Sequence, residues 1–117
     1  MSETRFPVEM VNGVPIVAAP EEIDITNADE LRAAVLQAAS SGDGTFVVDM
    51  SRTRFCDSAG LRVLTAAYRR AVADGGELRL ITAAGGPVFH VLTLTGMYRL
   101  IPTFSSLEEA LVEGLPL

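Results

Sequence analysis

Short apolar runs alternate with longer segments of helical periodicity along most of this chain, and that alternation constrains its fold more than any other feature. The expected strands cover residues 7–10, 14–19, 45–50, 77–81 and 100–104, and the expected helices begin at residues 28, 58, 87 and 107. Strand–helix–strand units join parallel strands through right-handed crossovers. We therefore expect an α/β fold with a mixed β-sheet and the element order ββαβαβαβα.

Turn residues and strand composition indicate how this sheet is arranged. Asn12-Gly13 is a dipeptide that tolerates positive φ, so it predicts a hairpin between the first two strands, at one side of the sheet. The Val-rich run at residues 45–50 is typical of a central strand that is covered on both faces. Pro102 has no backbone N–H to donate, which suits an edge strand.

Hydroxyl and amide side chains mark the expected starts of two helices. Thr26 or Asn27 is predicted to cap the helix that begins at residue 28. Ser105 or Ser106 is predicted to cap the last helix, residues 107–113. Acidic residues in the first turn of that helix complement its dipole.

Length and composition fit one domain. The chain has 117 residues, of which 49% are hydrophobic, and this is enough apolar material to close a single core. We expect a single domain over residues 1–117, with its core at about residues 6–114. No apolar run approaches the roughly 18 residues that span a bilayer, and no basic segment followed by an apolar run opens the chain. These features predict a cytoplasmic protein with no membrane segment.

Charge and residue types argue against several function classes. The formal net charge of −6 at pH 7 would repel a phosphate backbone, so we expect no direct nucleic-acid partner. All 9 basic residues are arginines, which leaves no lysine for a Schiff base or a Walker loop. Cys56 and His90 are the single cysteine and the single histidine, too few ligands for a Cys/His metal site. We expect no metal and no cofactor.

Residues 51–61 form the candidate functional loop, because loops at the carboxyl ends of strands carry function in such sheets. A helix N-terminus presents free N–H groups and a positive dipole end, which would favour a phosphate on Ser58. The alternative is that Ser58 only caps the helix. The small Ala59 and Gly60 leave the Ser58 hydroxyl accessible, and because Gly60 lowers helix propensity, a close approach explains it better than stability does.

An acidic chain has one locally basic region here. Five of its arginines lie in or after this loop: Arg52, Arg54, Arg62, Arg69 and Arg70. Such a cluster is either a solvated helix face or a contact surface for an acidic partner, or for a nucleotide that a partner holds. The sequence leaves both interpretations open.

Several motifs together resemble one family. Residues 47–51 (VVDMS) and 55–61 (FCDSAGL) resemble the strand and phosphorylation loop of STAS-domain anti-sigma factor antagonists. Residues 22–28 (EIDITNA) resemble the family's segment that opens the first helix. Residues 96–102 and 106–111 are similar to its closing strand and helix. The resemblance covers almost the whole chain and implies a STAS-like fold.

The resemblance also implies a partner-switching cycle and no enzymatic activity. The unmodified protein would bind an anti-sigma factor that is also a serine kinase, and so free a sigma factor. Phosphorylation of Ser58 would end the binding, and a serine phosphatase would restore it. Asp24 and Asp57 would help the kinase to bind metal-nucleotide or to recognise the loop, although Asp24 is alternatively a turn or cap residue. The expected partner-binding residues are Asp24, Arg54, Asp57, Ser58, Ala59, Gly60 and Arg62.

The rival functions are an enzyme and a scaffold. Ser58 could act as a nucleophile with His90 as its base, but Gly-x-Ser-x-Gly is absent, and the apolar pattern around His90 predicts a packing role. Asp24 and Asp57 as a catalytic carboxylate pair have no supporting motif. Cys56 is predicted to be a small buried residue rather than a redox site. The scaffold alternative keeps the fold without the switch, as a subunit of a stress-signalling or lipid-transport assembly.

Overall fold

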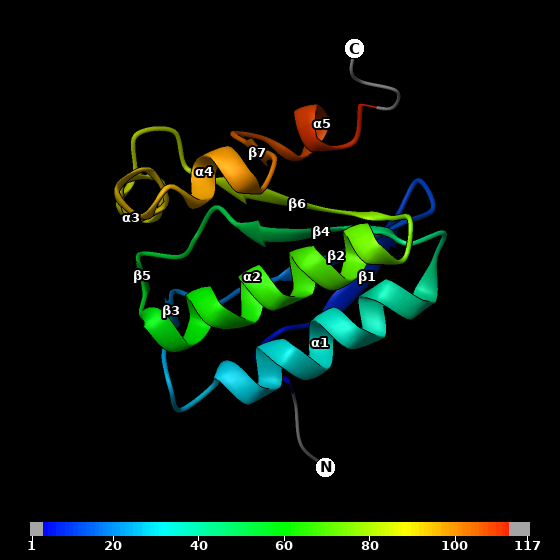
Figure 1. The fold of residues 1–117 in the computed structure, drawn as a ribbon, viewed down its shortest axis with the longest axis horizontal. Coiled ribbons are helices and arrows are strands. Elements are labelled where there is room, and N and C mark those ends of the chain that lie inside the picture. The colour runs from blue at the N-terminus through cyan, green and yellow to red at the C-terminus, as the bar shows by residue number, and fades with distance from the viewer. Residues whose placement is uncertain (1–3, 113–117) are drawn as a thin grey trace.

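A computed structural model of the protein describes residues 4–112. Its main sheet has five strands in the order β1-β2-β4-β6-β7 (Figure 1). These strands are β1 (Val8–Val11), β2 (Val14–Ala18), β4 (Thr45–Met50), β6 (Glu77–Thr82) and β7 (Thr103–Phe104). β1 is antiparallel to β2, and all other neighbours are parallel. The predicted mixed sheet of an α/β fold is confirmed, with β4 at its centre.

The N-terminal hairpin forms one edge of this sheet, as predicted. β1 and β2 close on each other at Val11 and Val14, which lie opposite one another. Between them Asn12 and Gly13 have φ of 53° and 81°, the left-handed conformation that Asn and Gly tolerate best. A two-residue turn of this kind fixes the register of the strands, and therefore which side chains of β2 face the core.

Two hydrophobic cores lie on opposite faces of the sheet. Side chains alternate between the faces along a strand, so Val48 of β4 enters the larger core and Val47 enters the smaller one. The helices are α1 (Ala28–Ser41), α2 (Ser58–Ala73), α3 (Pro87–Thr95), α4 (Met97–Leu100) and α5 (Leu107–Ala110). α1 and α2 cover the larger core, and α5 contributes Ala110 to the smaller one (Figure 1).

The region after α3 differs from the sequence prediction. The strand predicted over residues 100–104 is wrong in its first part, because Leu100 belongs to α4 and β7 begins only at Thr103. Gly96 has a φ of 80°, which ends α3 and turns the chain into α4. Met97 is 9% exposed and anchors that short helix in the larger core.

The last helix is capped as predicted but is shorter. The Ser106 hydroxyl oxygen accepts a hydrogen bond from the Glu109 backbone N–H at 3.1 Å. The Glu109 carboxylate in turn accepts from the Ser105 backbone N–H at 3.2 Å. α5 ends at Ala110 rather than at residue 113, and residue 113 lies outside the described residues.

A second, two-stranded sheet positions the candidate loop. β3 (Glu22–Ile23) pairs in parallel with β5 (Phe55–Cys56), with Ile23 opposite Cys56. The sequence did not predict it, because two residues are too few to show the alternation by which strands are recognised. The pairing joins the segment before α1 to the segment before α2.

Two features are absent from residues 4–112. No helix there is long and apolar enough to cross a membrane. Nor does this part of the chain place three or more His, Cys, Asp or Glu side chains where they could hold a metal ion.

Candidate functional site

Ser58 is the first residue of α2, and the residue before it caps the helix. The Asp57 carboxylate accepts hydrogen bonds from the backbone N–H groups of Ala59 at 2.9 Å and Gly60 at 3.3 Å. Asp57 also has the extended backbone of an N-cap, with ψ of −174°. The alternative that Ser58 is the cap is therefore wrong. Its side chain is exposed and is not used to satisfy the helix end.

Backbone hydrogen bonds hold this loop against the segment before α1. The Glu21 carbonyl accepts from the N–H groups of Arg54 at 2.7 Å and Phe55 at 3.2 Å. The Ile23 carbonyl accepts from the Asp57 N–H at 3.1 Å. These bonds and the β3–β5 pairing make one ordered unit from two segments that are about thirty residues apart in sequence. These hydrogen bonds therefore fix the position of the backbone that leads into Ser58.

Gly60 allows the closest packing in this unit. A Cβ atom at Gly60 would lie 2.6 Å from Cγ2 of Ile23 and 2.7 Å from Sγ of Cys56. The close approach predicted at Gly60 is confirmed, and the structure shows that the approaching side chains are those of Ile23 and Cys56. Cys56 is only 5% exposed, and burial, together with the charge of Asp57, raises the pKa of its thiol to about 12. The prediction that Cys56 is a buried packing residue is also confirmed.

Asp24 is fixed beside this unit by a turn. Its carboxylate accepts from the Thr26 hydroxyl at 2.5 Å and from the Thr26 backbone N–H at 2.9 Å. Those bonds, the hydroxyl bond first, lower the pKa of the Asp24 carboxyl below its usual value. Asp24 directly follows β3, as Asp57 directly follows β5, so the parallel pairing brings the two residues to the same end of the small sheet.

Asn27 occupies the N-cap position of α1, but its side chain supports the same turn instead of bonding to the helix end. Its side-chain oxygen accepts from the Asp24 backbone N–H at 2.9 Å, and its side-chain nitrogen donates to the Glu22 carbonyl at 2.9 Å. Its side chain makes no capping hydrogen bond to α1, so the prediction that Asn27 caps α1 through its side chain is wrong. The Thr26 hydroxyl bonds to Asp24 instead. At 4% exposure, Asn27 joins the turn to β3 from the interior.

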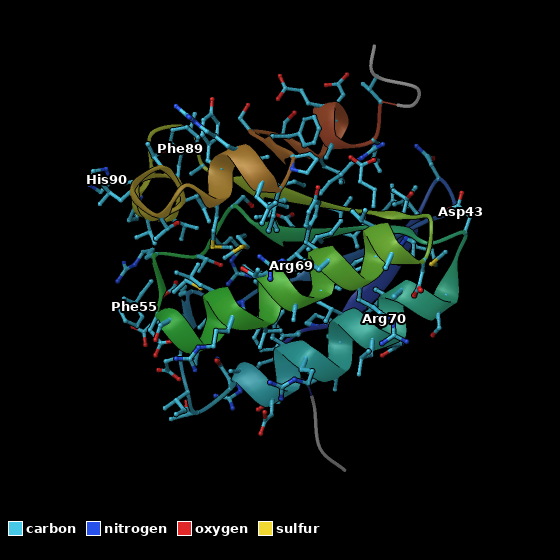
Figure 2. The ribbon with its side chains drawn as sticks, in the orientation of Figure 1. Asp43, Phe55, Arg69, Arg70, Phe89 and His90 are labelled. Carbon is cyan, nitrogen blue, oxygen red and sulfur yellow. The ribbon has the colours of Figure 1, made fainter. Side chains whose placement is uncertain are left out.

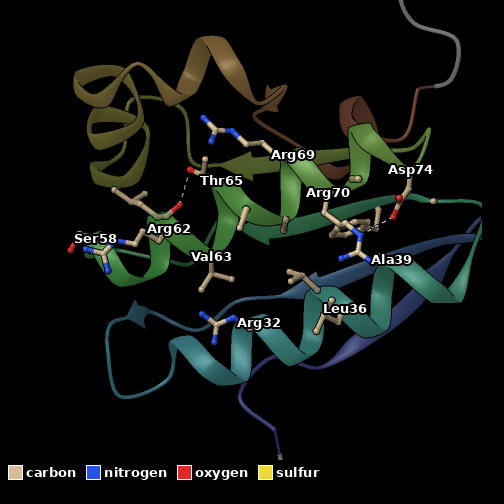
Figure 3. A pocket seen from close by; sticks show the side chains of 17 residues that line it. Arg32, Leu36, Ala39, Ser58, Arg62, Val63, Thr65, Arg69, Arg70 and Asp74 are labelled. Carbon is tan, nitrogen blue, oxygen red and sulfur yellow. Dashed lines mark hydrogen bonds and ion pairs between the residues drawn. The ribbon is translucent and has the colours of Figure 1, made fainter.

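Of the remaining predicted contact residues, Arg54 and Arg62 are exposed and Ala59 is partly exposed, whereas the contact predicted at Gly60 is wrong because Gly60 is buried against Ile23 and Cys56. Arg62 lies one helical turn after Ser58, so both side chains are on the same face of α2, and both are exposed (Figure 3). Arg54 is exposed at the start of the loop. Arg70 forms an exposed ion pair with Asp74 at 3.1 Å. Within residues 4–112, no ion pair involves the other four arginines of the predicted basic region: Arg52, Arg54, Arg62 and Arg69.

Two exposed apolar side chains beside the site were missed by the sequence interpretation. Ile25 is 79% exposed in the turn after β3, and Phe55 is 51% exposed in β5 (Figure 2). The FCDSAGL motif contains Phe55, but alternation cannot tell the inner from the outer face of a two-residue strand. The paired sheet turns Cys56 inward, and Phe55 therefore outward.

His90 does not complete a catalytic arrangement with Ser58. It is exposed on α3 and points away from the body of the protein (Figure 2), so its predicted packing role is wrong. Val88 and Leu92 supply the buried stripe of that helix, and a residue midway between them faces outward. Among the described residues no hydrogen bond joins Ser58 and His90.

Comparisons with known proteins agree on one family. The model of the STAS domain matches residues 5–110. The anti-sigma-F factor antagonist RsfB of Mycobacterium tuberculosis is 30% identical over 104 residues, which are 86% of this chain and 80% of the relative. The anti-sigma F factor antagonist of Paenibacillus polymyxa is 27% identical over 110 residues, 93% of each chain. A crystal structure of an anti-sigma factor antagonist from Mycobacterium paratuberculosis is 29% identical, with a TM-score of 0.80 over 91% of this chain and 89% of that one.

Proposed function

The chain belongs to the STAS domain family, and we propose that it is an anti-sigma factor antagonist that is switched off by phosphorylation of Ser58. The proposed partner is an anti-sigma factor that is also a serine kinase. The unmodified chain binds this partner and so frees a sigma factor, and a serine phosphatase reverses the modification. A single domain over residues 1–117, located in the cytoplasm, is part of the proposal.

The observation that carries this proposal is the exposed Ser58 side chain at the start of α2, behind a cap that Asp57 already supplies. A kinase can reach the hydroxyl without opening the helix end. A phosphate there would lie at the positive end of the helix dipole, which favours it. Phosphorylation of Ser58 is therefore expected to leave the fold intact and to weaken binding of the partner.

The surface around Ser58 has the composition of a protein interface. Exposed Ile25 and Phe55 offer apolar contacts, as the centre of an interface requires. Asp24, whose carboxylate accepts two hydrogen bonds from Thr26, and exposed Arg62 offer charged contacts. Ala59 is partly exposed and has a small side chain, so it leaves the Ser58 hydroxyl accessible to a partner. We assign the partner's contact to this surface.

The charge of a phosphate is large enough to end such a contact. Phosphoserine adds roughly 1.5 to 2 negative charges. One unfavourable unit-charge contact near 4 Å in a partly desolvated interface costs on the order of 4 kcal/mol, which is about a thousandfold in affinity. The carboxylate of Asp57, which precedes Ser58 in the sequence, adds to the negative charge that the partner would meet.

The proposal is tested by measuring complex formation between the purified chain and each serine-kinase-type anti-sigma factor of its source organism. Calorimetric titration should find one partner that binds the unmodified chain and that binds Ser58→Ala with similar affinity. Ser41→Ala, at the far end of α1, is the matched control. If no candidate binds either form, the antagonist assignment fails and the non-switching scaffold alternative is favoured.

A further inference from the structure

A groove with an apolar floor runs between α1 and α2. Its cavity volume is about 740 Å³, within the range of small-molecule sites. Leu36 of α1 lies at its wall and is 56% exposed, although it is a large aliphatic side chain. Figure 3 shows the wall residues of α1 facing the underside of α2. The apolar lining includes Val35, Leu36, Ala39, Phe46, Val63 and Ala67.

Four arginines are among the residues that line this cavity, in a chain whose net charge is −6. Arg32, Arg62, Arg69 and Arg70 all line the cavity, and Asp74 is the one acidic side chain among its lining residues. Figure 3 shows Arg32 on α1 and Arg70 on α2 pointing into the space between the helices, whereas Arg69 points away from α1. The cavity therefore combines apolar area with concentrated positive charge.

These arginines are available to an incoming anion. Arg32 pairs with Asp29 and Arg70 pairs with Asp74, but all four side chains are more than half exposed, and exposed pairs of this kind are weak. Arg62 and Arg69 form no ion pair with any residue in the described range. A carboxylate or phosphate could replace the weak partners or bind beside them.

We propose that this groove binds one anionic amphiphile as a free monomer, with its apolar body on the floor and its carboxylate or phosphate group at the arginines. The apolar floor disfavours a purely hydrophilic anion, and the arginines disfavour a neutral or cationic ligand. A bilayer is not the occupant, because the floor lies between two helices and an acidic chain is repelled by anionic lipid surfaces. The lining includes Ser58 and Arg62, so the groove adjoins the proposed partner surface, but binding of the amphiphile does not require phosphorylation of Ser58.

Titration calorimetry with decyl phosphate, below its critical micelle concentration, tests this site. Decyl phosphate should bind saturably at one site per chain. Decanol, which lacks the charge, and inorganic phosphate, which lacks the chain, should each bind at least about tenfold more weakly. Saturable binding that decanol matches in affinity would overturn the charged part of the site, and with it the proposal.

Two groove variants and two matched controls locate the site. Leu36→Glu places a carboxylate at the apolar wall and should weaken binding at least about tenfold, and Arg62→Gln should weaken it about threefold. Leu94→Glu is the control for the first variant, because Leu94 is 72% exposed on α3, outside the groove. Arg99→Gln on α4 is the control for the second. Both controls should bind as the parent does.

Unchanged thermal unfolding should show that the variants are folded, since all four substituted side chains are exposed. Three results would overturn the proposal: no saturable binding of decyl phosphate, equal binding by Leu36→Glu and the parent, or binding to anionic vesicles without binding to the monomer. Self-association of the parent that Leu36→Glu abolishes would also overturn it, because it would assign the groove to a second copy of the chain.

Discussion

A glycine allows close packing near each end of α2, but the neighbouring atoms differ between the two ends. At the N-terminal end, a Cβ at Gly60 would meet the side chains of Ile23 and Cys56. At the C-terminal end, a Cβ at Gly76 would lie 2.2 Å from the backbone oxygen of Gly44. The first contact lies behind an exposed serine, whereas the second joins two backbone turns.

The C-terminal end of α2 therefore stabilises the fold, whereas the N-terminal end lies at the proposed contact with a partner. The C-terminal turn closes α2 onto β6 through the Gly76 N–H, which donates to the Ala71 carbonyl at 2.8 Å. The N-terminal end holds Asp57 and Ser58 against the small sheet. Changes at the C-terminal end should therefore alter stability alone. Changes at the N-terminal end should alter partner binding.

The largest effect is expected from a negative charge at Ser58. Ser58→Asp should weaken binding of the anti-sigma factor about a hundredfold, near 3 kcal/mol, because a carboxylate reproduces part of the phosphate's charge. Ala73→Asp, exposed at the other end of α2, is the matched control and should bind as the parent does. Calorimetric titration measures both, and equal weakening by the two variants would remove the distinction between the ends.

Gly76→Ala should produce the largest loss of stability. Its Cβ would meet backbone rather than a side chain, so the turn at Gly44 has to move. We expect the free energy of unfolding to fall by about 2.5 kcal/mol, with partner affinity unchanged for the folded molecules. Urea unfolding gives the first quantity and calorimetry the second. A loss of affinity without a loss of stability would contradict the assignment of this end to the fold.

Gly60→Ala should lower both stability and partner affinity. The loss of stability should be smaller than for Gly76→Ala, and the loss of affinity smaller than for Ser58→Asp. The new methyl group displaces Ile23 or Cys56, while alanine recovers about 1 kcal/mol of helix propensity, so the net loss of stability should be about 1.5 kcal/mol. Because the loop must shift, binding of the anti-sigma factor should weaken several-fold. Parallel unfolding and binding measurements check this, and an Ala variant with parent-like affinity would show that the packing behind Ser58 does not set its position.

The smallest expected effect is a pH dependence from Asp24. Its folded pKa is lowered by the Thr26 bonds, so its contribution to stability is present above the unfolded value of about 3.9. That contribution is lost as the pH falls through the lower folded pKa. Asp24→Asn should be slightly less stable than the parent at pH 7, with the difference disappearing in acid. Urea unfolding at pH 7 and in acid measures this difference in stability. A difference that grows in acid would contradict the lowered pKa of Asp24.

Sequence predicted the parts of the fold that local chemistry decides. The hairpin at Asn12-Gly13 and the central position of β4 depend on backbone preferences and strand periodicity, and both are confirmed. The β3–β5 sheet was missed because each strand is defined by its partner, not by its own pattern. His90 was misplaced because its apolar neighbours extend around α3 and conceal which stripe is buried.

The candidate site was predicted in position but not in detail. The sequence placed Ser58 at a helix start, which is confirmed. It did not identify Asp57 as the cap, since serine and aspartate both cap well and differ here by one position. The exposure of Phe55 and the groove beside Leu36 were also missed, because both depend on segments that meet only in the folded chain.

Intact-mass analysis with site mapping, after incubation with ATP and the anti-sigma factor that binds the chain, tests the central proposal most directly. We expect the addition of one phosphate, on Ser58, together with loss of the complex. Ser58→Ala should remain unmodified and stay bound. A phosphate on another residue, or a Ser58-phosphorylated chain that keeps the complex, would contradict the assignment of the switch to this end of α2.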